Sequence, residues 1–383
     1  MAGGPVAPGS VQDRSASGNA GVLPSVLRRR PDRCRPAPAV RRHRRAMSGD
    51  EPAFPEEEGG PRRRLDYFGH VFPPLRRMVR QHLHEGFERE RRRSGLTAAW
   101  YVPASLDSPD CAWVHETEDA DWLPGLLSDA GLGRFTRPGF TTRWQQAGLY
   151  QPRPQPALRP DLAAAGLADP LGVCEVYGAG PWVILADRAR LRGRPVPQGW
   201  EDLLSPQYRG DIVANGSDGR LAGVLLFNLF VDFGLDGLQA LGANMWGFRG
   251  GAQMARNLGS GDPEGAALAI LPYFWALNNI HRDRVALVWP REGAYAVPLL
   301  LLRRHDAPPA ARLAHALLTG RDWAGRMESA GCASNRDDSG GAPLPGPLRW
   351  LGWSHARGLD FPGLHPLCDA ALARGALGMD LKR

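Results

Sequence analysis

From Val173 onward, runs typical of β-strands alternate with longer runs typical of α-helices. Strands are expected at Trp182–Ala186, Ile212–Ala214, Ala267–Leu271, Ala286–Trp289 and Ala296–Leu302. Helices are expected at Gly219–Phe233, Leu235–Met245, Ala252–Leu258, Pro308–Leu318 and Asp322–Ala330. Strands that are separated by helices predict an α/β fold, with parallel or mixed sheets covered by helices on both faces.

The earlier part of the chain has a less regular pattern. Apolar residues at helical spacing predict one amphipathic helix over about Pro74 to Arg93. A strand is expected over Leu96–Val102, and shorter helices are expected within Trp113–Gly131 and Arg134–Leu149. The longest apolar run, Leu221–Phe233, is shorter than the roughly 18 residues that a membrane span needs.

The basic charge of the chain is concentrated at its beginning. The whole chain has a net charge of +7 and residues 1–46 alone carry +8, so the remainder carries −1. Residues 1–64 have no hydrophobic period and are expected to be a disordered tail and linker. The tail could be an arm that binds an anionic polymer, an export signal, or upstream sequence before a true start at Met47. The folded body is not expected to bind nucleic acid.

Several enzyme classes are excluded by composition and motif. The chain holds 46 arginines and a single lysine, Lys382, next to its C-terminal residue. A P-loop or a Schiff-base enzyme needs a better placed lysine. GxSxG, HExxH and CxxC motifs are absent from the sequence, and residues 178–182 lack the third glycine of a dinucleotide fingerprint. The chain is therefore not expected to be an enzyme, and no cofactor is expected.

A proline-rich connection runs from Pro195 to Asn215, between two of the expected strands. Its first prolines, Pro195 and Pro197, hold the chain extended and exclude a helix. Residues 200–204 predict one short amphipathic turn, which Pro206 ends. An ordinary helix-to-strand connection would have this pattern, but it would not require these particular residues.

The connection resembles the segment PVPxSWEDLLDPKYKGKI of solute-binding proteins of ABC importers, in their iron-type or thiamine-type group. Further resemblances follow in the same order. They are residues 212–226, the family's PxxGA turn at 289–294, its NPEAAKKFIDFLLS helix at 308–318, and at 349–353 the KWLGW ending of a subgroup that often lacks an export signal. The resemblance extends from about Leu65 to the C-terminus and is strongest from Val173 to Gly331.

The resemblance implies a type II periplasmic-binding-protein clamp, in which two α/β domains with mixed sheets and flanking helices close on a ligand. The first domain would be residues 65–180 plus 291–383, and the second 181–290. Gly178 and Gly180 are expected in the hinge, because glycine permits backbone rotation. The implied function is the solute-binding component of an ABC importer, a periplasmic monomer whose partners are a permease with its ATPase. The alternative is a cytoplasmic ligand-sensing protein with the same clamp and no transport role.

In such a clamp the ligand lies at the carboxyl ends of strands and at helix N-termini. Ser217 or Asp218 is expected to cap the following helix, and Arg220 to bind an anionic ligand group in its first turn. Glu292 and residues 67–70 would face the same cavity from the first domain. A plain capped turn with a surface arginine explains the first three residues equally well.

Tyr273 occupies the position where ferric-binding relatives carry two adjacent tyrosines. Here Pro272 and Phe274 flank it, so Tyr273 is the single candidate metal ligand, which argues against an iron site. With Phe274 and Trp275 it could instead form an aromatic wall for an organic ligand, such as a thiamine-like cation. Packing in the core is the other explanation for Phe274 and Trp275. The ligand is therefore a metal ion or complex, a thiamine-like molecule or an anionic organic solute.

Overall fold

The computed structural model describes residues 64–103, 112–132, 135, 138–217, 219–262 and 265–376. The expected disordered tail therefore lies outside the described residues, except for Arg64, and so does Asp218. The strands are β1 (Tyr67–Gly69), β2 (Trp100–Tyr101), β3 (Leu126–Ala130), β4 (Glu175–Asp187), β5 (Ile212–Ser217), β6 (Arg220–Leu221), β7 (Met245–Arg249), β8 (Leu268–Pro272), β9 (Val285–Val288), β10 (Ala294–Arg303), β11 (Ala333–Ser334) and β12 (Leu348–Arg349).

The α-helices are α1 (Arg76–Ser94), α2 (Ala112–Glu116), α3 (Pro138–Gln146), α4 (Pro160–Ala164), α5 (Gly223–Asn244), α6 (Gly251–Asn257), α7 (Tyr273–Leu277), α8 (Pro309–Leu318), α9 (Arg321–Ser329), α10 (Gly352–Gly358) and α11 (Phe361–Ala376). Short 3₁₀ helices are η1 (Pro73–Leu75), η3 (Ala120–Trp122), η5 (Glu201–Leu204) and η6 (Pro206–Tyr208). The predicted alternation of strands and helices after Val173 is confirmed. The predicted turn at residues 200–204 is η5, and Pro206 begins η6.

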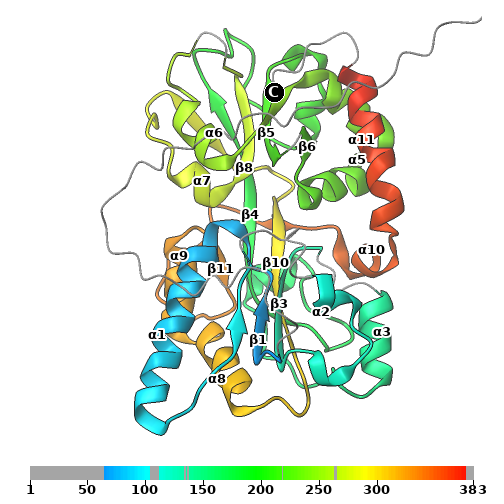
Figure 1. The fold of residues 1–383 in the computed structure, drawn as a ribbon. Helices are drawn as coiled ribbons and strands as arrows, with labels where there is room; N and C mark the ends of the chain where they lie inside the picture. The colour runs from blue at the N-terminus through cyan, green and yellow to red at the C-terminus, as the bar shows by residue number, and fades with distance from the viewer. Residues whose placement is uncertain are drawn as a thin grey trace, which may run out of the picture. The chain divides into compact units, whose positions relative to one another are not determined.

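Two long strands connect two groups of elements. The sheet order is β2-β1-β3-β10-β4-β8-β5-β6. The first half of β4 pairs with β10, its second half pairs with β8 and β9, and Trp182 lies opposite both Tyr295 of β10 and Pro272 of β8. Figure 1 shows β4 and β10 running between the group that holds β1, β3, α1 and α8 and the group that holds β5, β8, α5 and α6. We call β4 and β10 the crossover strands.

The amphipathic helix predicted near the start of the body is confirmed as α1. Its apolar residues Val79, Leu83 and Phe87 are buried in the core. The helix ends at Gly95, whose φ of 78° gives a left-handed C-cap that is readily available only to glycine. The sequence pattern placed this helix correctly because its apolar stripe and its stop signal agree.

Six of the described strands were not predicted, namely β1, β3, β6, β7, β11 and β12, and β3 and β7 are the longest of them. Residues 126–130 were expected to be helical but form β3, and residues 245–249 form β7. All five residues of β3 are buried, including polar Ser128 and Asp129. A short strand that is buried on both faces shows no alternation of polar and apolar residues, so its pattern cannot be told from that of a buried helix.

Helix α5 is interrupted at Gly234, where φ is 64° and ψ is −167°, as the two helices predicted on either side of this residue imply. Among the described helices, α5 alone is long and apolar enough to cross a membrane by length and composition, a test that core helices also pass.

Helix α5 packs closely against α11: a Cβ on Gly242 would collide with the backbone of Leu372. Helix α11 thus packs on an element of the expected second domain, although residues 291–383 were assigned to the first. The domain bounds remain a prediction.

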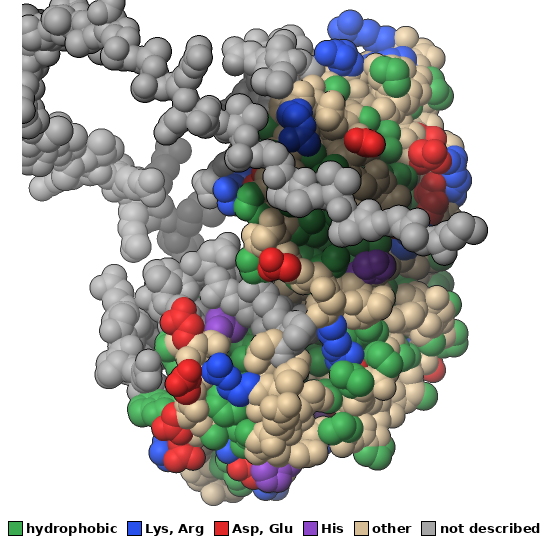
Figure 2. All heavy atoms as spheres, turned by 90° about the vertical axis from the view of Figure 1, so that its right-hand side faces the viewer, with side chains coloured by type: hydrophobic (Ala, Val, Ile, Leu, Met, Phe, Trp, Pro, Cys, Tyr) green, Lys and Arg blue, Asp and Glu red, His purple; other side chains and the backbone are tan. Residues whose placement is uncertain are grey.

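Acidic and basic side chains are interspersed on the face of the molecule that carries α10 and α11, as Figure 2 shows. Charged side chains of the described body are also paired with one another. Arg349 lies 2.5 Å from Asp232, and Arg357 lies 2.8 Å from Asp169. Mixed signs on this face agree with the nearly neutral charge of the body after residue 46.

Candidate functional site

The turn after β5 forms a hairpin, in which Ser217 pairs with Arg220 of β6. Helix α5 begins two residues after this hairpin, and its N-cap residue is Ala222, which has no side-chain oxygen. The prediction that Ser217 or Asp218 caps this helix is therefore wrong. The sequence Ser-Asp-Gly fits a helix start and a tight hairpin equally well, and strand pairing decided between them.

Arg220 lies on the hairpin and not in the first turn of α5. Its side chain is 67% exposed, and its Nε is 3.4 Å from Oδ2 of Asp369 on α11. His365 Nδ1 lies 3.2 Å from the same oxygen. The charge of Arg220 is thus directed to an acidic group of the protein itself. Its role as an anion anchor remains a prediction, and a ligand anion would have to compete with Asp369.

Tyr273 is the first residue of α7, directly after β8. Its ring lies edge-on to Trp289 at 5.4 Å, and a Cβ on Gly331 would lie 3.0 Å from its Cδ1. Burial raises the pKa of the Tyr273 phenol, so the neutral hydroxyl is favoured over the phenolate. Tyr273 therefore lies where β8 approaches the loop after α9, with a side chain suited to stacking and hydrogen bonding.

The described residues fit a ferric ion poorly. A hard trivalent cation needs several anionic oxygen ligands. Within the part of the chain that the structure describes, no group of three His, Cys, Asp or Glu residues is arranged to hold a metal ion. The residue next to Tyr273 is Phe274, whose ring lies edge-on to Trp275 at 4.7 Å. The aromatic cluster thus offers one phenol and two rings without metal-binding atoms.

Glu292 braces the proline-rich connection. Its Oε2 accepts a hydrogen bond of 3.3 Å from the backbone N–H of Trp200, and a Cβ on Gly199 would collide with its carboxylate. The ring of Trp200 stacks on Tyr295 at 4.2 Å and 16°, and its Nε1 donates to the Gly293 carbonyl at 2.9 Å. These contacts hold the connection against the turn that precedes β10.

The residues expected from the first domain are buried. The hydroxyl of Tyr67 forms a hydrogen bond of 2.8 Å with Ser128, and burial raises its pKa. His70 is also buried, with Nδ1 3.9 Å from Oδ1 of Asp129 and its ring 5.0 Å from that of His115. Tyr67 is therefore part of the packed end of β1 and β3. A role for these residues toward a ligand stays a prediction.

The two predicted hinge glycines lie within β4, in its half paired with β10. A Cβ on Gly178 would collide with the carbonyl oxygen of Ala333, and one on Gly180 would lie 2.6 Å from Cε1 of Phe72. Neither residue has a positive φ. Glycine is required here because other groups approach the strand closely, and the hinge itself stays a prediction.

A hydrogen-bonded network that the sequence analysis missed joins α5 to the crossover strands. The hydroxyl of Tyr295 donates to Asp232 Oδ2 at 2.6 Å, and Arg349 donates to both oxygens of Asp232, at 2.8 and 2.5 Å. Burial, followed by the charge of Asp232, raises the pKa of Tyr295, and the hydrogen bond with Asp232 raises that of Arg349. The sequence placed Asp232 within a predicted helix, but it did not show that Tyr295 and Arg349 would be the partners of its carboxylate.

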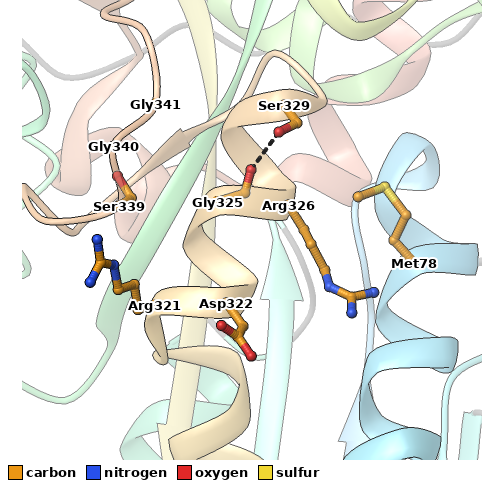
Figure 3. Close-up of a pocket in the computed structure, with 9 residues that line it drawn as sticks. All are labelled: Met78, Arg321, Asp322, Gly325, Arg326, Ser329, Ser339, Gly340 and Gly341. Carbon is orange, nitrogen blue, oxygen red and sulfur yellow. Dashed lines mark hydrogen bonds between the residues drawn. The ribbon is translucent and has the colours of Figure 1, made fainter.

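A surface groove of about 510 Å³ lies over α9, bounded by Met78 of α1 and by residues 339–341. Figure 3 shows Arg326 on the side of Met78, and Arg321 and Ser339 on the other side of the helix. Arg326 lies 3.3 Å from Glu85, and the Ser329 hydroxyl donates to the Gly325 carbonyl at 2.8 Å. The polar groups around this groove do not converge on one point, so we do not place the site there.

The strand order and the crossover strands define an α/β binding protein of the clamp type. The chain belongs to the family described as bacterial extracellular solute-binding protein, whose model matches residues 121–358, more than half of the chain. The members of this family bind solutes outside the cytoplasm and are not enzymes. No curated protein is similar enough in sequence to count as a match.

Solved structures of similar fold align with this chain over nearly their whole length. Apo FutA2 from Synechocystis has a TM-score of 0.55 at 16% identity, over 80% of this chain and 98% of that one. Trichodesmium IdiA (FutA), in complex with iron and citrate, has 0.55 at 13%, over 81% and 98%. Periplasmic AfuA from Actinobacillus pleuropneumoniae, with fructose 6-phosphate, has 0.52 at 13%, over 82% and 99%. The predicted type II periplasmic-binding-protein fold is thereby confirmed.

Proposed function

We propose that this chain is the solute-binding component of an ABC importer, and that it carries a small organic solute in place of a ferric ion held by its own side chains. Binding proteins of this fold include one in complex with iron and citrate and one with fructose 6-phosphate. The fold therefore accommodates chemically different ligands, and the side chains at the site must decide between them.

One observation carries the choice of ligand class: the position expected to bind iron offers a single phenol. Tyr273 is followed by Phe274 and lies edge-on to Trp289. Burial raises the pKa of Tyr273, and a phenolate would be required to hold Fe(III). An aromatic ring with a neutral hydroxyl suits an organic molecule, which it can contact through its face and through one hydrogen bond.

The ligand class is tested by adding ferric citrate to the full chain and recording the visible absorption of an iron–phenolate complex. We expect no such band for the parent chain and the same iron retention in Tyr273→Phe. Tyr67→Phe is the matched control, because Tyr67 is buried against Ser128 and away from α7. A visible band that disappears in Tyr273→Phe but persists in Tyr67→Phe would refute the proposal.

The transport role is tested separately by fractionating cells that express the native gene product. Recovery outside the cytoplasm, and association with a permease and its ATPase in a pull-down, are the expected results. Retention in the cytoplasm would favour the alternative of a ligand-sensing protein that keeps the clamp fold.

A further inference from the structure

One face of α5 is directed at the crossover strands. A Cβ on Gly131 would lie 2.6 Å from Cγ2 of Val224 and 3.3 Å from Cγ1 of Val297, so the first turn of α5 adjoins β10. Two turns further along, Asp232 accepts the hydrogen bond of Tyr295. Residues four apart lie on the same face of a helix, so Asn228, midway between Val224 and Asp232, faces β10 as well.

The crossover strands present a matching set of residues. Trp182 of β4 lies directly opposite Tyr295 of β10 in an antiparallel pair, so the two side chains share one face of the sheet. Alternation along the strands places Gly180 and Val297, which are also paired, on that same face. We call Gly180, Trp182, Tyr295 and Val297 the crossover face. Phe72 approaches it at Gly180, and Val224 approaches it at Val297.

Two polar atoms beside the crossover face have no hydrogen-bond partner among the described residues. Trp182 is 3% exposed, and its indole Nε1 has no acceptor. Asn228 is 2% exposed; its Nδ2 donates to the Val224 carbonyl at 2.7 Å, but its Oδ1 receives no hydrogen bond. Buried donors and acceptors are normally paired, because leaving them unpaired destabilises the folded state. Two such atoms of opposite character at one face therefore require an explanation.

The charged group nearest to these atoms in the helix is already engaged. Asp232, one turn beyond Asn228, is bound by Tyr295 and by both donors of Arg349. The unused hydrogen-bonding capacity of this face is thus uncharged: one indole N–H donor and one amide oxygen acceptor. An indole N–H cannot ligate a metal ion, and a desolvated anion needs charged or multiple donors.

We propose that Trp182 and Asn228 are polar anchors of the solute site, and that the solute presents to them an uncharged group with both an acceptor and a donor, such as an aminopyrimidine edge, a carboxamide or a sugar diol. The indole N–H donates to the acceptor of the solute, and Asn228 Oδ1 accepts from its donor. The inference rests on the proposed solute-binding function and names the substrate class of that site. Such a site binds analogues that lack either group less tightly, because their binding would leave a buried polar atom without a partner in the complex.

The test measures calorimetric binding of four probes to the full chain: cytosine, fructose, fructose 6-phosphate and ferric citrate. Fructose and its phosphate form a matched pair that differs in charge. We expect the parent chain to bind cytosine or fructose, and more tightly than either anionic probe. Trp182→Phe and Asn228→Leu are each expected to weaken that binding at least tenfold. Both variants should still unfold in one cooperative thermal transition, although Asn228→Leu also loses the hydrogen bond from Nδ2 to the Val224 carbonyl.

Trp323→Phe is the matched control. Trp323 is also buried with an unpartnered Nε1, but it lies on α9, where its ring stacks on His82 at 5.3 Å. This variant removes the same chemical group from another place and should bind the probes as the parent does. A Trp182→Phe variant that keeps the parent's affinity would overturn the proposal, as would a parent chain that binds none of the four probes. Binding of only the anionic probes would overturn it while leaving the solute-binding function intact.

Discussion

Two buried tryptophans lie beside Tyr295, and the structure uses them differently. Trp200 stacks on the Tyr295 ring and donates its indole N–H to Gly293, so all of its interactions are satisfied within the protein. Trp182 lies opposite Tyr295 in the sheet, but its indole N–H has no acceptor among the described residues. Trp200 holds the proline-rich connection in place, whereas the indole N–H of Trp182 is not used in any described hydrogen bond. Burial alone therefore does not distinguish a structural residue from a candidate binding residue.

The largest effect is expected from Trp200→Ala. It removes a large ring from the core and the hydrogen bond to Gly293, so it should lower the free energy of unfolding by about 3–5 kcal/mol. Chemical denaturation of the variant and the parent measures the difference. Leu171→Ala, at an exposed position, is the control and should change stability little. A loss below about 1 kcal/mol in Trp200→Ala would show that Trp200 is not the structural residue that the comparison with Trp182 assumes.

A second experiment examines the strand that carries Trp182. Gly178→Ala should lower the free energy of unfolding by about 1–3 kcal/mol, because the new methyl group meets the backbone of Ala333. Gly180→Ala should have a smaller effect, because the ring of Phe72 can move. Both variants should also be examined by small-angle scattering with and without a bound solute. If either keeps full stability but no longer becomes more compact on binding, glycine acts there through hinge rotation and not through close packing.

Tyr295 contacts both tryptophans, and Tyr295→Phe measures how much its hydroxyl group contributes to the free energy of unfolding. The variant loses one hydrogen bond to Asp232 but keeps both rings in contact, and Asp232 retains Arg349. We expect a loss of about 1 kcal/mol in the free energy of unfolding. Tyr150→Phe, which also loses one buried hydrogen bond, at 3.3 Å to Pro124, is the matched control. A loss several times larger than in the control would mean that the network acts cooperatively.

The smallest effect is expected from the titration of His82, whose ring stacks on Trp323, the buried tryptophan used above as the control. His82 donates a hydrogen bond of 3.0 Å from Nε2 to the Leu317 carbonyl, and burial lowers the pKa of His82 below 6.5. The unfolded chain therefore binds this proton more readily, and stability should fall as the pH decreases below about 6.5. Thermal unfolding of the parent and of His82→Gln between pH 8 and pH 5 measures this. An equal dependence on pH in both proteins would show that His82 does not contribute.

Much of the fold was predictable because local signals agreed with one another. The stripe on α1 and its terminal glycine, the break of α5 at Gly234 and the turn at residues 200–204 depend on neighbouring residues, and all three are present. Of these features, only the turn at residues 200–204 belongs to the segments that carry the family resemblance, and the family model matches residues 121–358. Such features can be predicted from sequence because backbone preference and spacing determine them.

For the candidate site, the sequence named the residues but not the partners that they have in the structure. The sequence Ser217–Arg220 was interpreted as a helix start, but pairing with β5 makes it a hairpin, and Arg220 is matched by Asp369 from the end of the chain. Glu292 accepts a hydrogen bond from Trp200, and its contact with a ligand stays a prediction. Charged residues near strand ends are natural candidates for binding, and their actual partners come from elements far away in sequence.

The sequence by itself determined the α/β class, the positions of α1, α5, α8, α9 and the crossover strands, the family and the absence of a second tyrosine beside Tyr273. Tertiary structure alone decided which polar groups are satisfied. Trp182 and Asn228 carry no motif, and their unpartnered atoms become apparent only where β4, β10 and α5 meet. The physical reason is that helix and strand formation depend on local geometry, whereas the satisfaction of a buried donor or acceptor depends on every element that packs around it.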